Sequence, residues 1–540
     1  MKVLLISINA KYIHTNNAVR LLKANSSFNP KIMEYTIKDQ ISGIADDINA
    51  SDADVIGCSV YIWNVNIFKA LFKQLSLTNK VLILGGPEVS YEASHFLQHT
   101  PADFVIKGEG EFVFESLLHA INNKTSYSHI QSLAYKQDGK ILQTPIQEIK
   151  DLSTLKAPYF FKDDIKHIPN RIAYIESSRG CPYKCSYCLS SLEKTVRFFP
   201  LDYVKKSILY LMEQGTKTIK FLDRTFNANK NTMDLLKFII DNNNYKTVFQ
   251  FEITGDILDP KIIHYINTTA PKGLFRFEIG IQSVNYETNY LVDRLQDNDK
   301  LFNNIRLIED KGVIALHLDL IAGLPMEDKD SFINTFDTVF KLGAKELQLG
   351  FLKMLRGTKI RLEADKYNYV YKDDAPYEII RNNVLSESDI EEIHLVEHML
   401  ELYHNKGYFR GNMLELILNQ KSPYVFFKTL GNHFINKGYS FKGFQIEDIY
   451  KRLFDIIDLY EQFKIKQDYL KRSKIKPKIF FENNITKETK NIVYSALSEK
   501  HNIPINTLYK HSVLINHQDV YVCALYQQNS CQLFHYQKKD

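Results

Sequence analysis

Short apolar runs alternate with amphipathic stretches along the first part of the chain. An uninterrupted apolar run at 3–8 (VLLISI) is typical of a strand that is buried on both faces of a sheet. Helical patterns such as NIFKALFKQL separate it from further runs of this kind at 53–61, 80–86 and 103–111. Strands that alternate with helices predict a parallel, doubly wound sheet, which binds ligands at the carboxyl ends of its strands.

A second series of strands and helices follows with a more regular spacing. Amphipathic helices such as 201–214 and 231–240 fit between its strands. Six strand–helix units predict a partial TIM-type barrel, and barrels carry their chemistry at the carboxyl ends of the strands. The expected strands lie at about 172–177, 217–222, 248–253, 274–281, 314–321 and 346–353.

Beyond about residue 370 the pattern changes to longer amphipathic helices, such as 386–407 and 445–463. The terminal stretch 476–540 mixes apolar runs with a helix and predicts a small α/β appendage. We therefore expect an α/β protein with three domains: a Rossmann- or flavodoxin-like domain at 1–150, a partial (β/α)6 barrel at 165–370, and a mostly helical region of unassigned role at 371–540.

Composition adds little to this picture except by exclusion. A net charge of +5 over 540 residues is mild, so neither nucleic acid nor a membrane surface is indicated as a partner. The first apolar run is too short for a signal peptide, and no window approaches eighteen consecutive apolar residues. Six cysteines in a chain of this length do not make a disulfide scaffold. We expect a reduced, cytoplasmic protein.

The strongest chemical signal is the segment CPYKCSYC, directly after the first expected barrel strand. Cys181, Cys185 and Cys188 form a Cys-x-x-x-Cys-x-x-Cys array. Three thiolates at this spacing can hold three irons of a 4Fe–4S cluster and leave the fourth iron without a protein ligand. The alternative is zinc or a fortuitous array, but a structural zinc site normally needs four protein ligands. The other cysteines (Cys58, Cys523 and Cys531) are single and remote.

This cysteine array resembles the signature of the radical S-adenosylmethionine (SAM) superfamily, in which an aromatic residue usually precedes the third cysteine, as Tyr187 does here. The resemblance implies that SAM chelates the open iron and that an electron from the reduced cluster cleaves it to methionine and a 5′-deoxyadenosyl radical. The protein's own task is then to position and shield these groups.

Polar residues stand at the ends of several expected barrel strands, where apolar core would be the default. Asp223 and Glu252 can be read equally as functional groups or as rim residues satisfied by the backbone. In the radical SAM family the segments FEIGIQS and LDLIAGLP line the SAM pocket. The resemblance implies a hydrogen bond from Gln282 to SAM and packing of the apolar run before Gly323 on adenine. The SAM-binding candidates are Glu278, Gln282, Ser283 and Gly323.

The first domain resembles the cobalamin-binding domain that is often fused ahead of a radical SAM barrel. Ser59 matches the serine after a middle strand of that family, and Gly85-Gly86 matches its later Gly-Gly turn. The resemblance implies that the backbone closes around the nucleotide tail of cobalamin at these three positions. The segment GEGE at 108–111 recurs at the end of the domain in such fusions. The alternative is a Rossmann-like domain with no cofactor.

The first loop of this domain departs from the family pattern Asp-x-His-x-x-Gly. Tyr12 replaces the aspartate and Asn17 the glycine, so that only His14 remains. A ligating histidine in this fold is ordinarily oriented by a carboxylate two residues earlier, which fixes its tautomer and raises its basicity. Tyr12 supplies no negative charge, and we therefore expect that His14 is not a strong cobalt ligand.

Taken together, residues 1–360 are identified as resembling cobalamin-binding-domain radical SAM enzymes. The resemblance implies methyl transfer or another radical modification of a substrate that the sequence does not name, with an electron donor such as flavodoxin or ferredoxin. Two alternatives remain: a radical SAM enzyme without cobalamin, and a non-catalytic iron–sulfur redox sensor. Methylthio-transferring relatives need three more cysteines in the first domain, where only Cys58 lies. The sequence identifies neither the catalytic residues nor the oligomeric state.

Overall fold

The computed structural model describes residues 1–193, 195–409 and 411–538. The chain divides by its contacts into two units, which are described separately. The first unit contains residues 1–328 and 350–386, and the second contains residues 329–349 together with the chain from 387 onward. The domain limits expected from the sequence stay a prediction.

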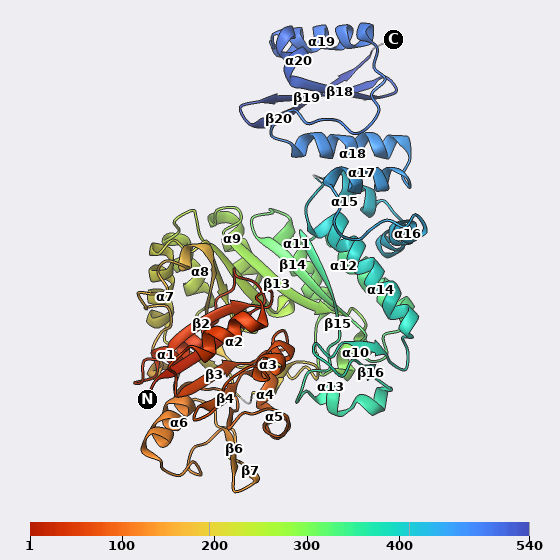
Figure 1. Cartoon of the computed structure of the whole chain (residues 1–540). Helices are drawn as coiled ribbons and strands as arrows, with labels where there is room; N and C mark the ends of the chain where they lie inside the picture. Colours follow the sequence, from red (N-terminus) through yellow and green to blue (C-terminus); the bar gives the residue numbers. More distant parts are fainter. Residues whose placement is uncertain (194, 410, 539–540) are drawn as a thin grey trace. The chain divides into compact units, whose positions relative to one another are not determined.

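The first unit begins with a seven-stranded sheet (Figure 1, red to orange). Its strand order is β2-β1-β3-β4-β5-β6-β7, in which β1 to β5 run parallel and β6–β7 is an antiparallel hairpin. The order 2-1-3-4-5 is that of flavodoxin-like folds. The strands are β1 (Val3–Asn9), β2 (Lys31–Thr36), β3 (Val55–Ser59), β4 (Val81–Gly85), β5 (Phe104–Ile106), β6 (Leu133–Gln137) and β7 (Lys140–Gln143).

Helices cover both faces of this sheet, which is why all seven residues of β1 are buried. Residues of α2, α3, α4 and α5 form one hydrophobic core with the sheet, and residues of α1 and α6 form the other. The predicted doubly wound sheet is confirmed. The helices are α1 (Asn17–Ala24), α2 (Ile41–Asn49), α3 (Val65–Phe72), α4 (Pro87–Ser90), α5 (Ala93–His99) and α6 (Glu111–Asn123).

The second sheet has six strands in the order β8-β11-β12-β13-β14-β15, as expected for a partial barrel. The pairs from β8 to β14 are all parallel. Each strand lies within a few residues of its predicted position. The strands are β8 (Ile172–Ile175), β11 (Thr218–Phe221), β12 (Val248–Ile253), β13 (Phe275–Gln282), β14 (Ala315–Ala322) and β15 (Glu346–Phe351).

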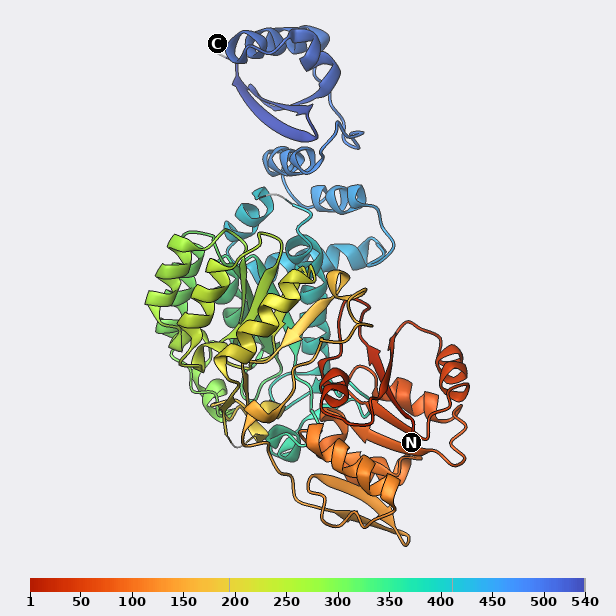
Figure 2. The same cartoon turned by 90° about the vertical axis from the view of Figure 1, so that its left-hand side faces the viewer.

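Burial alternates strictly along the barrel strands from β8 to β14. In β13, Phe275, Phe277, Ile279 and Ile281 are fully buried, and the residues between them are half-buried. Figure 2 shows the yellow and green helices on one side of the strands, and the first domain on the other. These helices are α7 (Leu201–Glu213), α8 (Thr232–Asp241), α9 (Pro260–Thr269), α10 (Tyr286–Leu291) and α11 (Asn298–Glu309); α13 (Lys359–Leu362), β16 (Val370–Tyr371) and β17 (Ile379–Arg381) complete the unit.

The second unit is mainly helical, as predicted, and ends in a small antiparallel sheet of order β18-β19-β20. Helices α19 and α20 pack against this sheet through residues such as Tyr494 and Leu508. None of the helices that the structure describes has the length and apolarity needed to cross a membrane. The elements are α12 (Lys329–Phe340), α14 (Glu387–Leu400), a π-helical turn (Glu401–Asn405), α15 (Asn412–Leu418), α16 (Pro423–Asn436), α17 (Ile446–Phe454), α18 (Leu459–Arg472), α19 (Lys487–His501), α20 (Ile505–His511), β18 (Ser512–His517), β19 (Val520–Gln527) and β20 (Ser530–Gln537).

Candidate functional site

The three motif cysteines lie on one loop that a short ribbon closes at its base. Strands β9 (Ser178–Arg179) and β10 (Arg197–Phe198) pair antiparallel, with Arg179 opposite Arg197. Gly180 follows β9 with a positive φ of 88°, and a Cβ there would overlap the carbonyl oxygen of Thr195. The loop between β9 and β10, which we call the cysteine loop, leaves the carboxyl side of β8 and therefore has a fixed beginning and end.

All three cysteines are free thiols, and Cys185 is the most buried of them. Burial raises the pKa of Cys185, while Arg294 opposes that rise and donates to its Sγ at 3.9 Å. The Sγ of Cys181 lies 3.7 Å from the hydroxyl of Thr225, which follows β11. Within the described residues, no three His, Cys, Asp or Glu side chains converge on a single metal ion. In an iron–sulfur cluster, by contrast, each thiolate binds a different iron.

Asp223, whose role the sequence left open, anchors the start of the cysteine loop. Its carboxylate is buried and accepts the Ser177 backbone N–H at 2.9 Å and the hydroxyls of Ser177 and Ser178 at 2.5 and 2.6 Å. Burial raises the pKa of Asp223 to about 6, although these hydrogen bonds act in the opposite direction. The residue holds the backbone that leads into β9, so its observed contacts are structural.

Gln282 ends β13 with a buried acceptor. Its φ is 69°, and its side chain folds back over Gly280, so that a Cβ added at position 280 would overlap it. The Oε1 atom of Gln282 is buried and makes no hydrogen bond with the described residues. Arg294 donates to the carbonyl of Gly280 and to Cys185, and so it connects this strand end to the cysteine loop. An orphaned acceptor at this place fits a ligand that donates a hydrogen bond.

The other SAM-binding candidates already have protein partners. Glu278 pairs with Lys220 at 2.6 Å and accepts from Gln250. Burial opposes ionisation of Glu278, but His317 and Lys220 lower its pKa to about 2. Ser283 is fully buried and donates to Glu327. At Gly323, a Cβ would overlap the side chain of Ile379. The SAM-binding role of all four candidates stays a prediction.

The cobalamin-binding candidates lie together at the carboxyl ends of β3 and β4. Ser59 is opposite Gly85 in the sheet, and its hydroxyl accepts from Asn16 at 3.0 Å. A Cβ at Gly86, whose φ is 116°, would overlap the carbonyl oxygen of Val60. A Cβ at Gly85 would have only the Cβ of Ile106 near it, at 4.0 Å. The turn itself therefore requires Gly86, whereas Gly85 leaves open space.

Two aromatic side chains at this edge were not predicted from the sequence. Trp63, the only tryptophan in the chain, stacks on Tyr61 with ring centroids 4.4 Å apart and is 45% exposed. Its Nε1 donates to the carbonyl of Ile8, at the end of β1, at 3.2 Å. The available signal was an isolated tryptophan directly after a strand that ends in Ser59.

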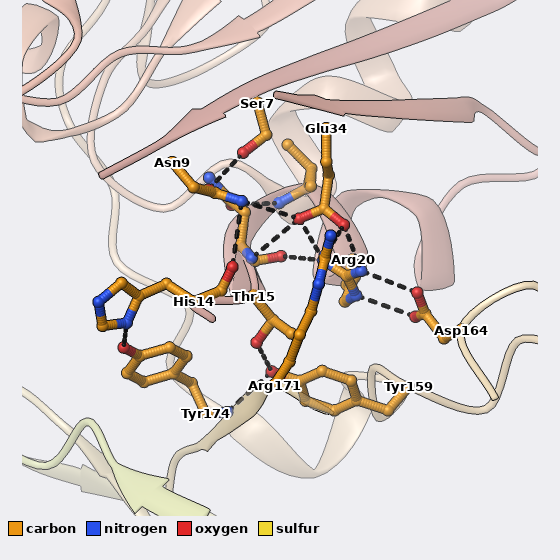
Figure 3. Close-up of polar contacts among 12 residues, drawn as sticks. Ser7, Asn9, His14, Thr15, Arg20, Glu34, Tyr159, Asp164, Arg171 and Tyr174 are labelled. Atoms are coloured by element: carbon orange, nitrogen blue, oxygen red, sulfur yellow. Dashed lines mark hydrogen bonds and ion pairs between the residues drawn. The ribbon is translucent and has the colours of Figure 1, made fainter. Parts of the chain in front are cut away.

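The imidazole ring of His14 contacts the barrel, while its backbone also bonds within its own domain, where the carbonyl accepts from Asn9 at 3.1 Å. Its Nδ1 lies 2.6 Å from the hydroxyl of Tyr174 in β8 (Figure 3), and its backbone forms a parallel bridge with Ile172. Burial lowers the pKa of His14, with smaller effects from Lys11 and Lys220. The ring thus has a phenol at Nδ1, where the family pattern would supply a carboxylate. The expectation that His14 is not a strong cobalt ligand stays a prediction.

The two candidate regions lie close to each other. Tyr91 follows the Gly85-Gly86 turn and packs against Gly357, where an added Cβ would lie 2.5 Å from the Cβ of Tyr91. Burial raises the pKa of Tyr91 to about 12. The loop after β5 reaches the base of the cysteine loop, since Glu109 lies 3.0 Å from Arg179 and 2.8 Å from Arg197. One edge of the first sheet therefore adjoins the barrel site.

Family models match three segments of the chain. The B12 binding domain matches residues 4–118, and the Radical SAM superfamily matches residues 175–339. A family described as a protein of unknown function (DUF4080) matches residues 365–534.

Curated relatives match parts of the chain. An uncharacterized methyltransferase of Pyrococcus horikoshii is 29% identical over 212 residues, which make up 37% of this chain and 46% of the relative. An anaerobic magnesium-protoporphyrin IX monomethyl ester cyclase of Synechocystis sp. is 24% identical over 255 residues, 46% of this chain and 50% of the relative. The cobalamin-dependent radical SAM methyltransferase TokK of Streptomyces tokunonensis is 22% identical over 361 residues, 61% of this chain and 50% of the relative. The chain spans about half of the length of these relatives.

Solved structures share the fold. The cobalamin-dependent SAM radical enzyme OxsB with aqua-cobalamin bound has a TM-score of 0.62 at 13% identity, covering 93% of this chain and 80% of that one. The radical SAM methyltransferase TsrM of Kitasatospora setae, with cobalamin and a 4Fe–4S cluster bound, has a TM-score of 0.58 at 16% identity, covering 70% and 80%. A radical SAM domain implies a 4Fe–4S cluster and SAM, and a B12-binding domain implies cobalamin. The chain therefore has a B12-binding domain ahead of a radical SAM domain.

Proposed function

We propose that this protein is a cytoplasmic radical SAM enzyme that transfers a methyl group to an unidentified substrate by means of a 4Fe–4S cluster, SAM and cobalamin. The observation that carries the proposal is the position of the cysteine loop: it follows β8, and the arginines at its base pair with Glu109, which follows β5 at the carboxyl edge of the first sheet. The names of the Pyrococcus relative, TokK and TsrM support methyl transfer. The cyclase of Synechocystis makes ring formation the second candidate reaction.

The cluster would be held by Cys181, Cys185 and Cys188. Arg294 places a guanidinium beside Cys185, which favours the thiolate that an iron needs. Anchors on both sides support the loop: Asp223 holds its entry, and the β9–β10 ribbon closes its base. These features suit a loop that must present three thiolates in one arrangement.

SAM would lie beside the open iron, within reach of the end of β13. The orphaned Oε1 of Gln282 would accept a hydrogen bond from a hydroxyl or amino group of SAM. Glu278 has the protein partners Lys220 and Gln250, so its part would be to fix the charge of the pocket wall. Ser283 and Gly323 would shape the same wall through their packing.

Cobalamin would bind at the carboxyl edge of the first sheet. Ser59 and the open space at Gly85 fit its nucleotide tail, and Gly86 keeps the turn that opens this space. When bound, the cluster supplies an electron for cleavage of SAM, and cobalamin supplies a carrier for the methyl group. Flavodoxin or ferredoxin would be the electron donor.

Trp63 offers a direct test of cobalamin binding, because it is the only tryptophan and lies at this edge. Aqua-cobalamin is titrated anaerobically while tryptophan fluorescence is followed, with free tryptophan as the control for absorption of light by cobalamin. We expect saturable quenching in the wild type and much weaker quenching in Gly85→Val. If the wild type shows no more quenching than free tryptophan, cobalamin does not bind at this edge, and a radical SAM enzyme without cobalamin becomes the better account.

A further inference from the structure

The base of the cysteine loop carries two buried arginines. Arg179 and Arg197 face each other across the β9–β10 ribbon, and each side chain is only 9% exposed. Neither arginine belongs to the cysteine motif, but each lies within a few residues of one end of the loop. Buried guanidinium groups are costly unless carboxylates pair with them, so their partners decide whether the ribbon is stable.

The decisive partners come from the first domain. Glu109 bridges the two arginines: its Oε1 lies 3.0 Å from Arg179 and its Oε2 lies 2.8 Å from Arg197. Glu111 pairs with Arg179 at 2.6 Å. Glu109 also accepts the backbone N–H of Ile149 at 2.5 Å. The Glu109 carboxylate thus connects both strands of the ribbon to the first domain.

The barrel side supplies one further carboxylate for each arginine. Glu176, at the end of β8, lies 2.9 Å from Arg179, and Glu193 of the cysteine loop lies 3.3 Å from Arg197. Among the carboxylates that the structure describes, only Glu109 pairs with both arginines. Loss of its charge would therefore weaken both ends of the loop at once, whereas loss of Glu176 or Glu193 would weaken one end.

This geometry explains the segment Gly108-Glu109-Gly110-Glu111, for which the sequence offered no mechanism. Gly108 has a φ of 69°, so it turns the chain between β5 and α6. A Cβ at Gly110 would lie 3.3 Å from the side chain of Leu22, which leaves little space for a larger residue. The two glycines thereby allow a turn from which both carboxylates reach the arginines.

We infer that Glu109 and Glu111 are positioning residues for the iron–sulfur cluster, and that the B12-binding domain holds the cysteine loop in the shape in which its three thiolates can retain iron. This inference rests on the proposed function, because it takes the three cysteines as the cluster ligands. It adds that the B12-binding domain forms part of the cluster site, and that the segment Gly108-Glu109-Gly110-Glu111 connects the two.

The chain contains a matched control for this inference. Glu34 is a similarly buried carboxylate that also bridges two arginines, Arg20 at 2.6 Å and Arg171 at 2.6 Å. It lies in the first domain and connects it to the barrel, but at the start of β8 instead of its end. Glu34→Gln therefore tests the loss of a buried carboxylate between the same two domains without touching the cysteine loop.

The experiment compares the wild type, Glu109→Gln, Glu111→Gln and Glu34→Gln as full-length chains after anaerobic reconstitution with iron and sulfide. The measured quantities are iron per chain, the rate of iron loss to a chelator, and the electron paramagnetic resonance spectrum of the reduced cluster. We expect iron loss to be about 10-fold faster in Glu109→Gln, the low end of the range for residues that directly support a metal ligand, because Glu109 supports the loop through Arg179 and Arg197. Glu111→Gln should have a smaller effect, and Glu34→Gln should match the wild type.

Two further measurements keep a folding defect apart from a positioning defect. Quenching of Trp63 by cobalamin reports whether the first domain is folded in each variant. Glu109→Asp, which keeps the charge, should recover part of the iron retention. Equal iron loss and equal spectra in the wild type and Glu109→Gln would overturn the inference alone, and so would equal acceleration in Glu34→Gln. A wild type that takes up no cluster would overturn the proposed function as well.

Discussion

Strand β8 is connected to the first domain by ion pairs at both of its ends, and the two sets of ion pairs support different parts of the barrel. At its start, Arg20 and Arg171 surround Glu34, and Arg20 also pairs with Asp164 (Figure 3). Past its end, Arg179 and Arg197 surround Glu109. Both clusters consist of buried guanidinium groups bridged by a carboxylate of the first domain. Only the second one adjoins the cysteine loop.

The difference shows that similar ion pairs can serve separate tasks. The pairs at the start of β8 join the first domain to the connector and to the edge of the barrel sheet, where Thr15 also donates to the Ile172 carbonyl at 2.8 Å. An exposed sheet edge needs such a cover. The pairs beyond the end of β8 adjoin the motif cysteines. We therefore expect changes at the start to reduce stability and changes at the end to alter iron binding.

The largest expected effect on stability comes from Glu34→Gln. The substitution leaves Arg171 buried without its carboxylate partner, so the free energy of unfolding should fall by about 3–5 kcal/mol. Urea denaturation followed by circular dichroism measures the change. Iron per chain, measured on the folded protein, should equal that of the wild type. A variant of unchanged stability that lost iron would reverse the assignment of the two clusters.

The pH dependence of stability should also separate the two ends of β8. Burial opposes ionisation of Glu34, but Arg20 and Arg171 lower its pKa to about 2. Its contribution is therefore present above about pH 4.5 and lost as the pH falls towards 2. Burial raises the pKa of Asp223 to about 6, so its contribution is present below about pH 4 and lost as the pH rises through 6.

Each of these pKa shifts changes the free energy of unfolding by about 3 kcal/mol between the low-pH and the high-pH limit. Urea denaturation at a series of pH values should show that Glu34→Gln flattens the profile between about pH 2 and 4.5. Asp223→Asn should flatten it between about pH 4 and 6. If the two substitutions altered the same pH range, the environments of the two carboxylates would have been assigned wrongly.

A smaller effect is expected at the Gly85-Gly86 turn. Gly86→Ala would place a Cβ against the Val60 carbonyl at a φ of 116°, and should lower the free energy of unfolding by about 1–3 kcal/mol. Gly85→Val meets open space, so its thermal stability should stay near that of the wild type while the quenching of Trp63 by cobalamin weakens. The pair of variants separates a backbone requirement from a ligand requirement. Loss of stability in Gly85→Val would show that the open space is needed for packing.

The smallest effect concerns the orphaned acceptor of Gln282. Gln282→Ala should weaken SAM binding by about 1–2 kcal/mol, or roughly tenfold in Kd, the scale of one hydrogen bond to a polar ligand. Isothermal titration of the reconstituted protein with SAM measures the change. Iron content should stay at the wild-type level, because Gln282 lies on a different strand end from the cysteine loop. Unchanged SAM affinity would place the ligand elsewhere.

Local patterns in the sequence predicted much of the fold. The buried run VLLISI became β1, and all six barrel strands lie close to their predicted positions. Both types of sheet are defined by hydrophobic periodicity within short segments, which a single sequence displays directly. The cysteine loop was visible for the same reason, since its three thiols lie within eight residues.

Contacts between distant segments could not be predicted in this way. Glu109 and Arg179 are 70 residues apart, and His14 and Tyr174 are 160 residues apart. Nothing in either segment indicates its partner, because an exposed and a paired carboxylate look the same in a sequence. Asp223 illustrates the limit: its place at a strand end was clear, but its three hydrogen bonds to Ser177 and Ser178 depend on how β9 folds back.

The central claim is that Cys181, Cys185 and Cys188 hold a cluster that cleaves SAM. The most direct test measures 5′-deoxyadenosine and methionine formed from SAM by reconstituted protein under dithionite. The variants are the triple Cys→Ala change at these positions and, as a control, the double change Cys523→Ala and Cys531→Ala. We predict SAM cleavage by the wild type and by the control, and none by the triple variant. Cleavage by the triple variant, or its absence in an iron-loaded wild type, would contradict the account.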